Sequence, residues 1–220
     1  MTEHELSPNT LKCHSPFRMI IAGSSGTGKT TFVRAFLRDY RFTTDISKPL
    51  LNVLYYYGQE QALFDVPVSS HVNIKYVRGY SDEHEDQRPD ILVIDDLMTE
   101  TGDDKRLSAL FTKGSHHLGI SVLFLVQNLF HKGKEMRTIS LNSQYIVAMN
   151  NPRDRLQLLH LGRQILPGKS EYFSRVVNMA FSEPFSHVMI DMSPSCPDDY
   201  RLRQRACVKG VQGYNVFLPK

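Results

Sequence analysis

The chain has 220 residues, of which 41% are hydrophobic and 22% are charged, the usual mixture for a globular protein. This composition excludes a fibrous or mainly disordered protein, and no apolar run approaches the roughly 18 residues that span a bilayer. We therefore expect one globular domain, with no membrane partner. We expect this domain to cover residues 16–192, with a flexible N-terminal arm over 1–15 before it and a C-terminal extension over 193–220 after it.

The net charge of +3 is unevenly distributed along the chain. Residues 82–104 hold ten acidic side chains and a single basic one, Arg88, so the remainder of the chain is strongly basic. A basic surface is typical of proteins that bind nucleic acid. An ordinary solvated face explains the same excess, so charge alone leaves both interpretations open.

Short apolar runs, each with the length of a buried strand, recur along the chain at 17–22, 51–57, 72–77, 91–95, 120–126, 145–149 and 188–190. Helical patterns follow residue 30, cover 105–112 and begin again at 151–154, whereas 81–90 and 130–143 have the composition of polar connections. Strands that alternate with helices predict an α/β fold with a mostly parallel central sheet flanked by helices. We expect the 91–95 and 122–126 strands to flank the 17–22 strand.

The most specific motif lies between the first predicted strand and the first predicted helix. Residues 23–30 read GSSGTGKT and match G-x-x-x-x-G-K-[ST]. Glycines allow successive backbone N–H groups to face one point and cradle phosphate oxygens, and the helix N-terminus adds its positive end. Lys29 would reach the β- and γ-phosphates, and the Thr30 hydroxyl would bind Mg²⁺. The residues expected to contact the nucleotide are Gly23, Ser24, Ser25, Gly26, Thr27, Gly28, Lys29, Thr30 and Thr31.

A pair of carboxylates follows the apolar run 91–94. Asp95, at the end of this predicted strand, is suited to hold Mg²⁺ opposite Thr30. Asp96 is placed to activate a water molecule as a general base. The simpler alternative is that the two aspartates only begin a surface loop.

Gln127 directly follows the apolar residues 122–126. Ligands of open α/β sheets bind at the carboxyl ends of the strands, so this side chain is expected at the same edge as the carboxylates. There it would sense the γ-phosphate or position water. The alternative is an amide that only satisfies neighbouring backbone groups.

Together these strings resemble the FtsK–HerA superfamily of ring-forming ATPases that pump DNA. More narrowly, IIAGSSGTGKTTF, ILVIDDLM, the long stretch LFTKGSHHLGISVLFLVQNLFHKGKEMRTISLNSQYIVAMNNPRDRLQLLHLGRQ and HVMIDMSP are similar to genome-packaging ATPases. The similarity is to those of Polinton/Maverick (adintovirus-like) elements and, more distantly, to the poxvirus packaging ATPase. It implies a P-loop NTPase fold of the ASCE, RecA/FtsK–HerA-like type. It also implies an enzyme that couples ATP hydrolysis to packaging double-stranded DNA into a capsid.

The resemblance further implies roles for particular residues. Lys29 and Thr30 would bind phosphate and Mg²⁺, Asp95 would bind Mg²⁺, Asp96 would activate water and Gln127 would act as the sensor. Much of the superfamily has Glu at the position of Asp96, so this shorter base must stand closer to the water or act through another one.

A homo-oligomeric ring with active sites between subunits is also implied, and such sites use an arginine from the neighbouring subunit. Arg137 is our first candidate for this arginine. The other candidates, for which a surface or DNA-facing position is the alternative, are Arg153, Arg155 and Arg163.

Two basic stretches are candidates for DNA contact. One contains His131, Lys132, Lys134 and Arg137, and the other contains Lys113, His116 and His117. Backbone phosphates need cations but no base readout, as a translocating motor requires. A solvated basic loop is the alternative for either stretch.

The resemblance implies a capsid or portal-vertex partner and an intracellular location in the nucleus or viral factory, with association with the virion as a further option. Two other functions remain open. A nucleoside-type kinase would use the same phosphate loop with a lid of arginines, and a nucleotide-gated capsid-binding scaffold would bind ATP without turnover.

Overall fold

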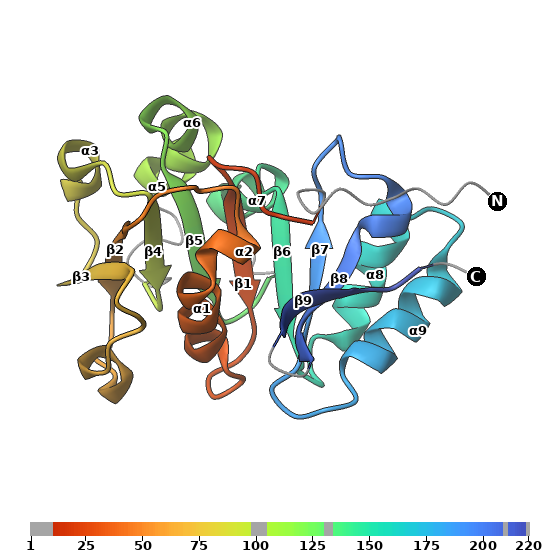
Figure 1. Ribbon diagram of the computed structural model, residues 1–220. Helices are drawn as coiled ribbons and strands as arrows, with labels where there is room; N and C mark the ends of the chain where they lie inside the picture. The colour runs from red at the N-terminus through yellow and green to blue at the C-terminus, as the bar shows by residue number, and fades with distance from the viewer. Residues whose placement is uncertain (1–10, 98–104, 130–133, 209–210, 219–220) are drawn as a thin grey trace.

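The computed structural model describes residues 11–97, 105–129, 134–208 and 211–218. Within these ranges nine strands form one sheet, with helices on both of its faces (Figure 1). The strands are β1 (Arg18–Ala22), β2 (Leu51–Tyr57), β3 (Val72–Arg78), β4 (Ile91–Asp95), β5 (Ser121–Val126), β6 (Tyr145–Met149), β7 (His187–Asp191), β8 (Leu202–Val208) and β9 (Val211–Val216). The α-helices are α1 (Lys29–Arg38), α2 (Tyr40–Thr43), α3 (Glu83–Gln87), α5 (Lys105–Ala109), α6 (Ser115–Leu118), α7 (Lys134–Leu141), α8 (Arg155–Ile165) and α9 (Ser170–Ala180). Single turns of other helix types are η1 (Ala62–Asp65), η2 (Leu110–Gly114) and η3 (Asp198–Tyr200).

The strand order across the sheet is β3-β2-β4-β5-β1-β6-β7-β8-β9. The six strands from β3 to β6 in this order pair in parallel, and β7, β8 and β9 continue the sheet in antiparallel pairs. The predicted α/β fold with a mostly parallel sheet is therefore confirmed. Successive residues of a strand face opposite sides of the sheet, and helices cover both sides, so β4, β5 and β6 are buried along their whole length.

One expected neighbour relation is wrong. β5 and β6 flank β1, whereas β4 pairs with β5 and β2 and is separated from β1 by a whole strand. A continuous apolar run indicates a strand in the sheet interior, but the order of strands depends on long-range crossovers that such a run does not encode. The order places the end of β5, with Gln127, between the phosphate loop and the end of β4.

The core has two layers, one on each face of the sheet. On one face Met19 and Ile21 of β1 pack with buried side chains of α1, including Val33 and Phe36. On the other face Ile20 packs in a cluster completed by side chains of α5, α7, α8 and α9. In the described parts of the chain, no helix has the length and apolar character needed to cross a membrane.

Three segments differ from the polar connections and helix limits expected from the sequence. Residues 83–87 of the predicted 81–90 loop form α3, which buries His84. Residues 134–141 of the predicted 130–143 connection form α7, because Met136 and Ile139 lie one turn apart and are both buried. The helix that begins at Lys105 continues beyond Gly114, through the π-helical turn η2, to the end of α6.

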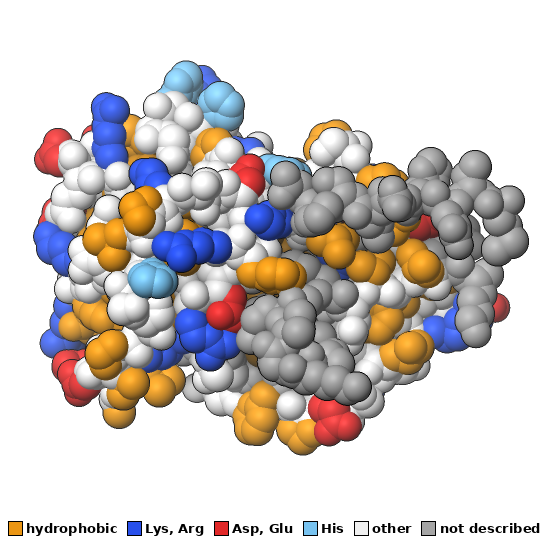
Figure 2. Space-filling model, in the orientation of Figure 1, with side chains coloured by type: hydrophobic (Ala, Val, Ile, Leu, Met, Phe, Trp, Pro, Cys, Tyr) orange, Lys and Arg blue, Asp and Glu red, His pale blue; other side chains and the backbone are white. Residues whose placement is uncertain are grey.

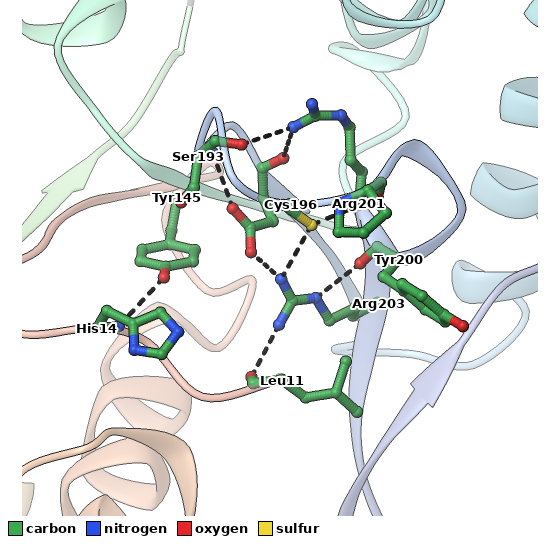
Figure 3. Close-up of polar contacts among 10 residues, drawn as sticks. Leu11, His14, Tyr145, Ser193, Cys196, Tyr200, Arg201 and Arg203 are labelled. Atoms are coloured by element: carbon green, nitrogen blue, oxygen red, sulfur yellow. Dashed lines mark hydrogen bonds and ion pairs between the residues drawn. The ribbon is translucent and has the colours of Figure 1, made fainter. Parts of the chain in front are cut away.

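The segment after residue 192 joins the sheet through a fully buried cation. Arg203 of β8 has no exposed surface and forms an ion pair with Asp191 of β7 (Figure 3). Its other donors reach the carbonyl oxygen of Leu11 at 2.8 Å and that of Tyr200 at 2.9 Å. One guanidinium thus connects β7, β8 and the residue at which the described chain begins, and its charge is compensated on three sides.

Candidate nucleotide-binding site

The loop between β1 and α1 has the backbone shape that phosphate binding requires. Gly26 and Gly28 have φ angles of 79° and 94°, in the left-handed region that favours glycine. At Gly23 a Cβ would lie 2.7 Å from both the Met149 Cβ and the Thr27 hydroxyl oxygen, so the close packing of loop and β6 also requires glycine. The loop leads directly into the N-terminus of α1, which begins at Lys29.

Lys29 folds back over this loop. Its ammonium group donates to the carbonyl oxygens of Gly23 at 2.6 Å and Ser24 at 3.1 Å. Burial lowers the pKa of Lys29, and the carboxylates of Asp95 and Asp96 act in the opposite direction. A cation is therefore held at the mouth of the loop, with the two carboxylates near enough to influence it.

Asp95, the last residue of β4, is buried and faces Thr30. The Thr30 hydroxyl lies 3.5 Å from Asp95 Oδ2. The same oxygen accepts a hydrogen bond from the Tyr55 hydroxyl at 2.6 Å and one from Gln61 Nε2 at 3.2 Å. Burial raises the pKa of Asp95, whereas the bond from Tyr55 and the charge of Lys29 lower it. The predicted pairing of Thr30 with Asp95 is thus present in the geometry, with two further partners.

Asp96 and Gln127 are also brought together. Gln127 Nε2 donates to Asp96 Oδ1 at 2.9 Å, across the boundary between β5 and β4. Asp96 has a φ of 55°, and its carbonyl oxygen would lie 2.6 Å from a Cβ at Gly58. A non-glycine residue in the left-handed region is uncommon and costs about 1–3 kcal/mol, although aspartate adopts this conformation more readily than most residues. The strained backbone turns the second carboxylate toward Gln127.

A cavity of about 730 Å³ joins these groups. It is lined by Ser25, Gly26, Gly28, Lys29, Thr30, Thr31, Asp95, Asp96 and Gln127 among the predicted residues. Gly23, Ser24 and Thr27 belong to the same loop through the contacts described above. The other side of the cavity is formed by residues that the sequence did not indicate, and these include Phe32, Gln61, Leu63, Phe185 and His187.

Two of these unexpected residues form an aromatic wall. Phe185 is 71% exposed and has a φ of 57°. It lies beside Gly28, since a Cβ added at Gly28 would be 3.6 Å from the Phe185 Cβ. His187 is buried and packs edge-on against Phe32 at 4.7 Å between ring centroids. Burial lowers the pKa of His187 to about 4, so the imidazole is neutral at pH 7. No sequence motif marks Phe185, because its place beside the loop arises from the pairing of β6 with β7.

The candidate arginines lie outside this cavity of their own chain. Arg137 on α7, Arg153 before α8 and Arg163 on α8 are exposed. Arg155 is half-buried, with its guanidinium 5.6 Å from the centroid of the Phe181 ring. An arginine that acts on a neighbouring subunit would have to be exposed. Arg137, Arg153 and Arg163 therefore remain candidates for that role, whereas Arg155 contacts Phe181 of its own chain.

The described residues of the two predicted basic stretches lie on elements that pack together, since α7 contacts η2. His131 and Lys132 are outside the described residues, and Lys134 is exposed at the start of α7. Lys113, His116 and His117 are exposed on η2 and α6, which precede β5. Gln127 follows the other end of β5, so this second stretch is at the edge of the sheet opposite the cavity. Figure 2 shows histidine side chains together with a basic one at the end of the molecule where α6 lies in Figure 1.

Comparison with known proteins gives one family match. The family described as Poxvirus A32 protein matches residues 3–190. No curated protein sequence matches the chain.

Similar folds occur among solved structures. The genome packaging NTPase B204 from Sulfolobus turreted icosahedral virus 2, in complex with ATP-gammaS, is 10% identical, with a TM-score of 0.49 over 85% of this chain and 94% of B204. EssC (ATPases 2 and 3) from Geobacillus thermodenitrificans is 17% identical, with a TM-score of 0.45 over 61% of this chain and 32% of that one. The ATPase DotB from Legionella pneumophila is 12% identical, with a TM-score of 0.41 over 77% and 54%.

The family match covers the phosphate loop, the carboxylate pair, Gln127 and the strands that carry them. It confirms the predicted resemblance to the poxvirus packaging ATPase. The chain therefore belongs to the poxvirus A32 protein family and is a P-loop ATPase.

Proposed function

We propose that this ATPase packages double-stranded viral or transposon DNA into a capsid, and that it works as a homo-oligomeric ring. The observation that carries the proposal is the placement of two carboxylates and an amide at the phosphate loop. Asp95 faces Thr30, and Gln127 Nε2 lies 2.9 Å from Asp96 Oδ1 on the wall of the same cavity. Such a second carboxylate suits the activation of water, so the site favours ATP hydrolysis, which a motor needs, over phosphate transfer to a nucleoside.

Mg²⁺ is the cofactor that this chemistry implies, and the residues present fit it. Thr30 and Asp95 offer a hydroxyl and a carboxylate oxygen 3.5 Å apart on the cavity wall, and Mg²⁺ prefers oxygen ligands. These two residues would hold the ion, directly or through water. When bound there, Mg²⁺ would neutralise negative charge that develops on the phosphate groups during hydrolysis.

Asp96 and Gln127 would act on the attacking water. The Asp96 carboxylate accepts the proton of the water, and Gln127, which donates to Oδ1 of Asp96, fixes the direction of the carboxylate. Because Asp96 has one methylene group less than Glu, this bond is important for placing the base. Lys29 would stabilise the charge on the β- and γ-phosphates.

Different groups lie on the two sides of β1, and this difference indicates the orientation of the nucleotide in the cavity. The groups for Mg²⁺ and water lie toward β5 and β4, whereas Phe185 lies on the side of β6 and β7. The γ-phosphate therefore belongs on the carboxylate side and the adenine on the side of Phe185. An exposed aromatic ring in a strained backbone is costly by itself, and stacking against a base offsets that cost.

DNA would contact the exposed basic groups, with Lys113, His116 and His117 as one surface and the start of α7 as the other. An arginine of the neighbouring subunit, with Arg137 as first candidate, would complete the site. A capsid or portal vertex is the expected docking partner, in the nucleus or a viral factory of the infected cell or on the virion.

The test is the ATPase rate with and without double-stranded DNA, together with the particle mass in the presence of a non-hydrolysable ATP analogue. We expect DNA to stimulate hydrolysis and the analogue to stabilise a ring of several subunits. Nucleotide binding without turnover would instead indicate a gated scaffold. Phosphorylation of an added nucleoside would indicate a kinase.

A further inference from the structure

Three donors converge on a single oxygen atom of Asp95. Oδ2 accepts from the Tyr55 hydroxyl at 2.6 Å, from Gln61 Nε2 at 3.2 Å and from the Thr30 hydroxyl at 3.5 Å. Within the described part of the chain, no hydrogen bond is assigned to the second oxygen, Oδ1. A carboxylate has about four acceptor positions, so this arrangement uses one oxygen for the protein and leaves the other for a ligand.

Tyr55 is rigidly held where it meets Asp95. It lies on β2, which pairs directly with β4, and only 1% of its surface is exposed. Its ring packs against Phe64 at 5.3 Å and Tyr76 at 5.2 Å between centroids. The direction of its hydroxyl is therefore set by packing, and the bond to Asp95 does not depend on a mobile side chain.

Gln61 reaches the same oxygen from the segment that follows β2, immediately before η1. Both donors thus come from one continuous stretch of chain, on the far side of β4 from Gln127. The two carboxylates are therefore held by different segments: Tyr55 and Gln61 bond to Asp95, whereas Gln127, directly after β5, bonds to Asp96.

We propose that Tyr55 and Gln61 are positioning residues, which fix the Asp95 carboxylate so that Oδ1 remains available to the Mg²⁺–nucleotide complex. The inference rests on the proposed Mg²⁺-dependent site. Hydrogen-bond partners of metal ligands typically change metal affinity by about 10–100-fold when they are removed. In this role both residues act through Asp95, and Tyr55 is not among the residues that line the cavity.

Tyr55→Phe tests the role of the hydroxyl, since it keeps the packed ring. A fluorescent ATP analogue is titrated into the protein over a range of Mg²⁺ concentrations and again in EDTA. We expect the Mg²⁺ concentration at half-maximal enhancement of binding to rise by about 10–100-fold. Binding in EDTA is expected to stay at the wild-type level, because Lys29 and the loop are untouched.

The neighbouring residue provides a matched control. Tyr56 lies one position along β2 on the opposite face of the sheet, where its hydroxyl contacts Ser81 and the backbone of His84. Tyr56→Phe removes an equivalent phenolic hydroxyl from the same strand and is expected to leave the Mg²⁺ dependence unchanged. A general loosening of β2 would affect both variants.

Gln61→Ala is the second variant and does not disturb the core, since Gln61 is only half-buried and lies in the extended segment before η1. We expect a shift in the same direction, and smaller because the bond of 3.2 Å is the longer one. If Tyr55→Phe does not fold, the Mg²⁺ dependence of Gln61→Ala still tests the positioning role.

Two results would overturn the inference, and they can be told apart. Wild-type Mg²⁺ dependence in both Tyr55→Phe and Gln61→Ala would reject the positioning role and leave the proposed function intact. Nucleotide binding that is independent of Mg²⁺ in the wild-type protein would reject the proposed site itself.

Discussion

Asp96 combines a strained backbone with a hydrogen bond from the side chain of Gln127, and both features orient its carboxylate. The φ of 55° and the bond from Gln127 direct the group into the cavity, where Asp95 already has three donors around one oxygen. Two adjacent aspartates therefore have different surroundings. This difference is the structural basis for assigning one to the metal and the other to the water.

Asp96→Asn is expected to retain ATP binding and lose hydrolysis, because an amide cannot accept the proton of the water. The measurement is equilibrium ATP binding together with the steady-state rate of phosphate release. Asp90→Asn is the control, since this buried aspartate pairs with Lys48 far from the cavity. A wild-type rate in Asp96→Asn would mean that the base is another residue.

Phe185→Ala is expected to weaken ATP binding by a factor of about 5–150, from the 1–3 kcal/mol that aromatic stacking on a base contributes. Inorganic triphosphate, which has no base, should bind to the variant and the wild type equally. Met179→Ala is the control, because Met179 is similarly exposed but does not line the cavity. Equal losses for ATP and triphosphate would place Phe185 at the phosphates instead.

Among the elements, α9 has a local pattern that indicates a helix, but its packing partner cannot be predicted from that pattern. Its buried residues Tyr172, Phe173, Val176 and Val177 recur with helical spacing and form one face. At Gly162 of α8 an added Cβ would lie 2.3 Å from the Phe173 ring. Such a close approach of two helices depends on pairing between segments, which a local pattern does not contain.

The residues of the candidate site likewise fall into those that a sequence motif marks and those that no motif marks. Lys29, Thr30, Asp95, Asp96 and Gln127 were predictable because each stands at the end of a strand or the start of a helix with a recognisable motif. Tyr55 and Phe185 carry no motif, since a tyrosine inside an apolar strand and a phenylalanine in a loop are usually core or surface residues. Their roles depend on the register of β2 with β4 and on the pairing of β6 with β7.

Gly162→Ala is expected to destabilise the protein by about 1–3 kcal/mol, the usual cost of overpacking a core contact. Chemical denaturation measures the change in the free energy of unfolding. Gln164→Ala, at an exposed position of the same helix, should change it by no more than about 0.5 kcal/mol. A neutral Gly162→Ala would show that α8 and α9 can separate at little cost.

The packing of α1 on β7 is expected to be sensitive to acid. The pKa of buried His187 is lowered to about 4, below the usual value of 6.5, so the unfolded chain takes up its proton first as the pH falls. Stability is therefore lost progressively from about pH 6.5 toward pH 4, with about 2 kcal/mol lost by pH 5.

Urea unfolding at pH 7 and pH 5 measures this loss, and His187→Gln is the informative variant because its amide does not titrate. Its absolute stability is expected to be lower, but the difference between the two pH values should shrink by about 2 kcal/mol. An unchanged difference would assign the acid sensitivity to other groups.

At the scale of the whole molecule, the exposed arginines concern the assembly rather than the single chain. If Arg137 acts on a neighbouring subunit, Arg137→Ala should bind ATP normally and lose turnover by a factor of about 10³–10⁵. If it contacts DNA instead, the basal rate survives and DNA stimulation falls, with a weaker dependence on salt.

Mixing subunits separates these roles further. Lys29→Ala subunits carry Arg137 but cannot bind phosphate properly, so they should restore some activity to Arg137→Ala subunits. Failure of rescue at every ratio, in rings shown to exchange subunits, would exclude Arg137 and make Arg153 the next candidate.

The buried ion pair between Arg203 and Asp191 determines how far the chain can be shortened. A recombinant fragment that ends at residue 192 would keep the carboxylate of Asp191 inside the protein and delete the guanidinium that compensates it. Breaking a buried pair in this way costs about 3–5 kcal/mol, a large part of the stability of an ordinary domain. The same fragment would expose the side of β7 that β8 covers, leaving an open sheet edge prone to aggregation. A minimal ATPase for biochemical work should therefore either include the strands after residue 200 or replace Asp191 with an uncharged residue.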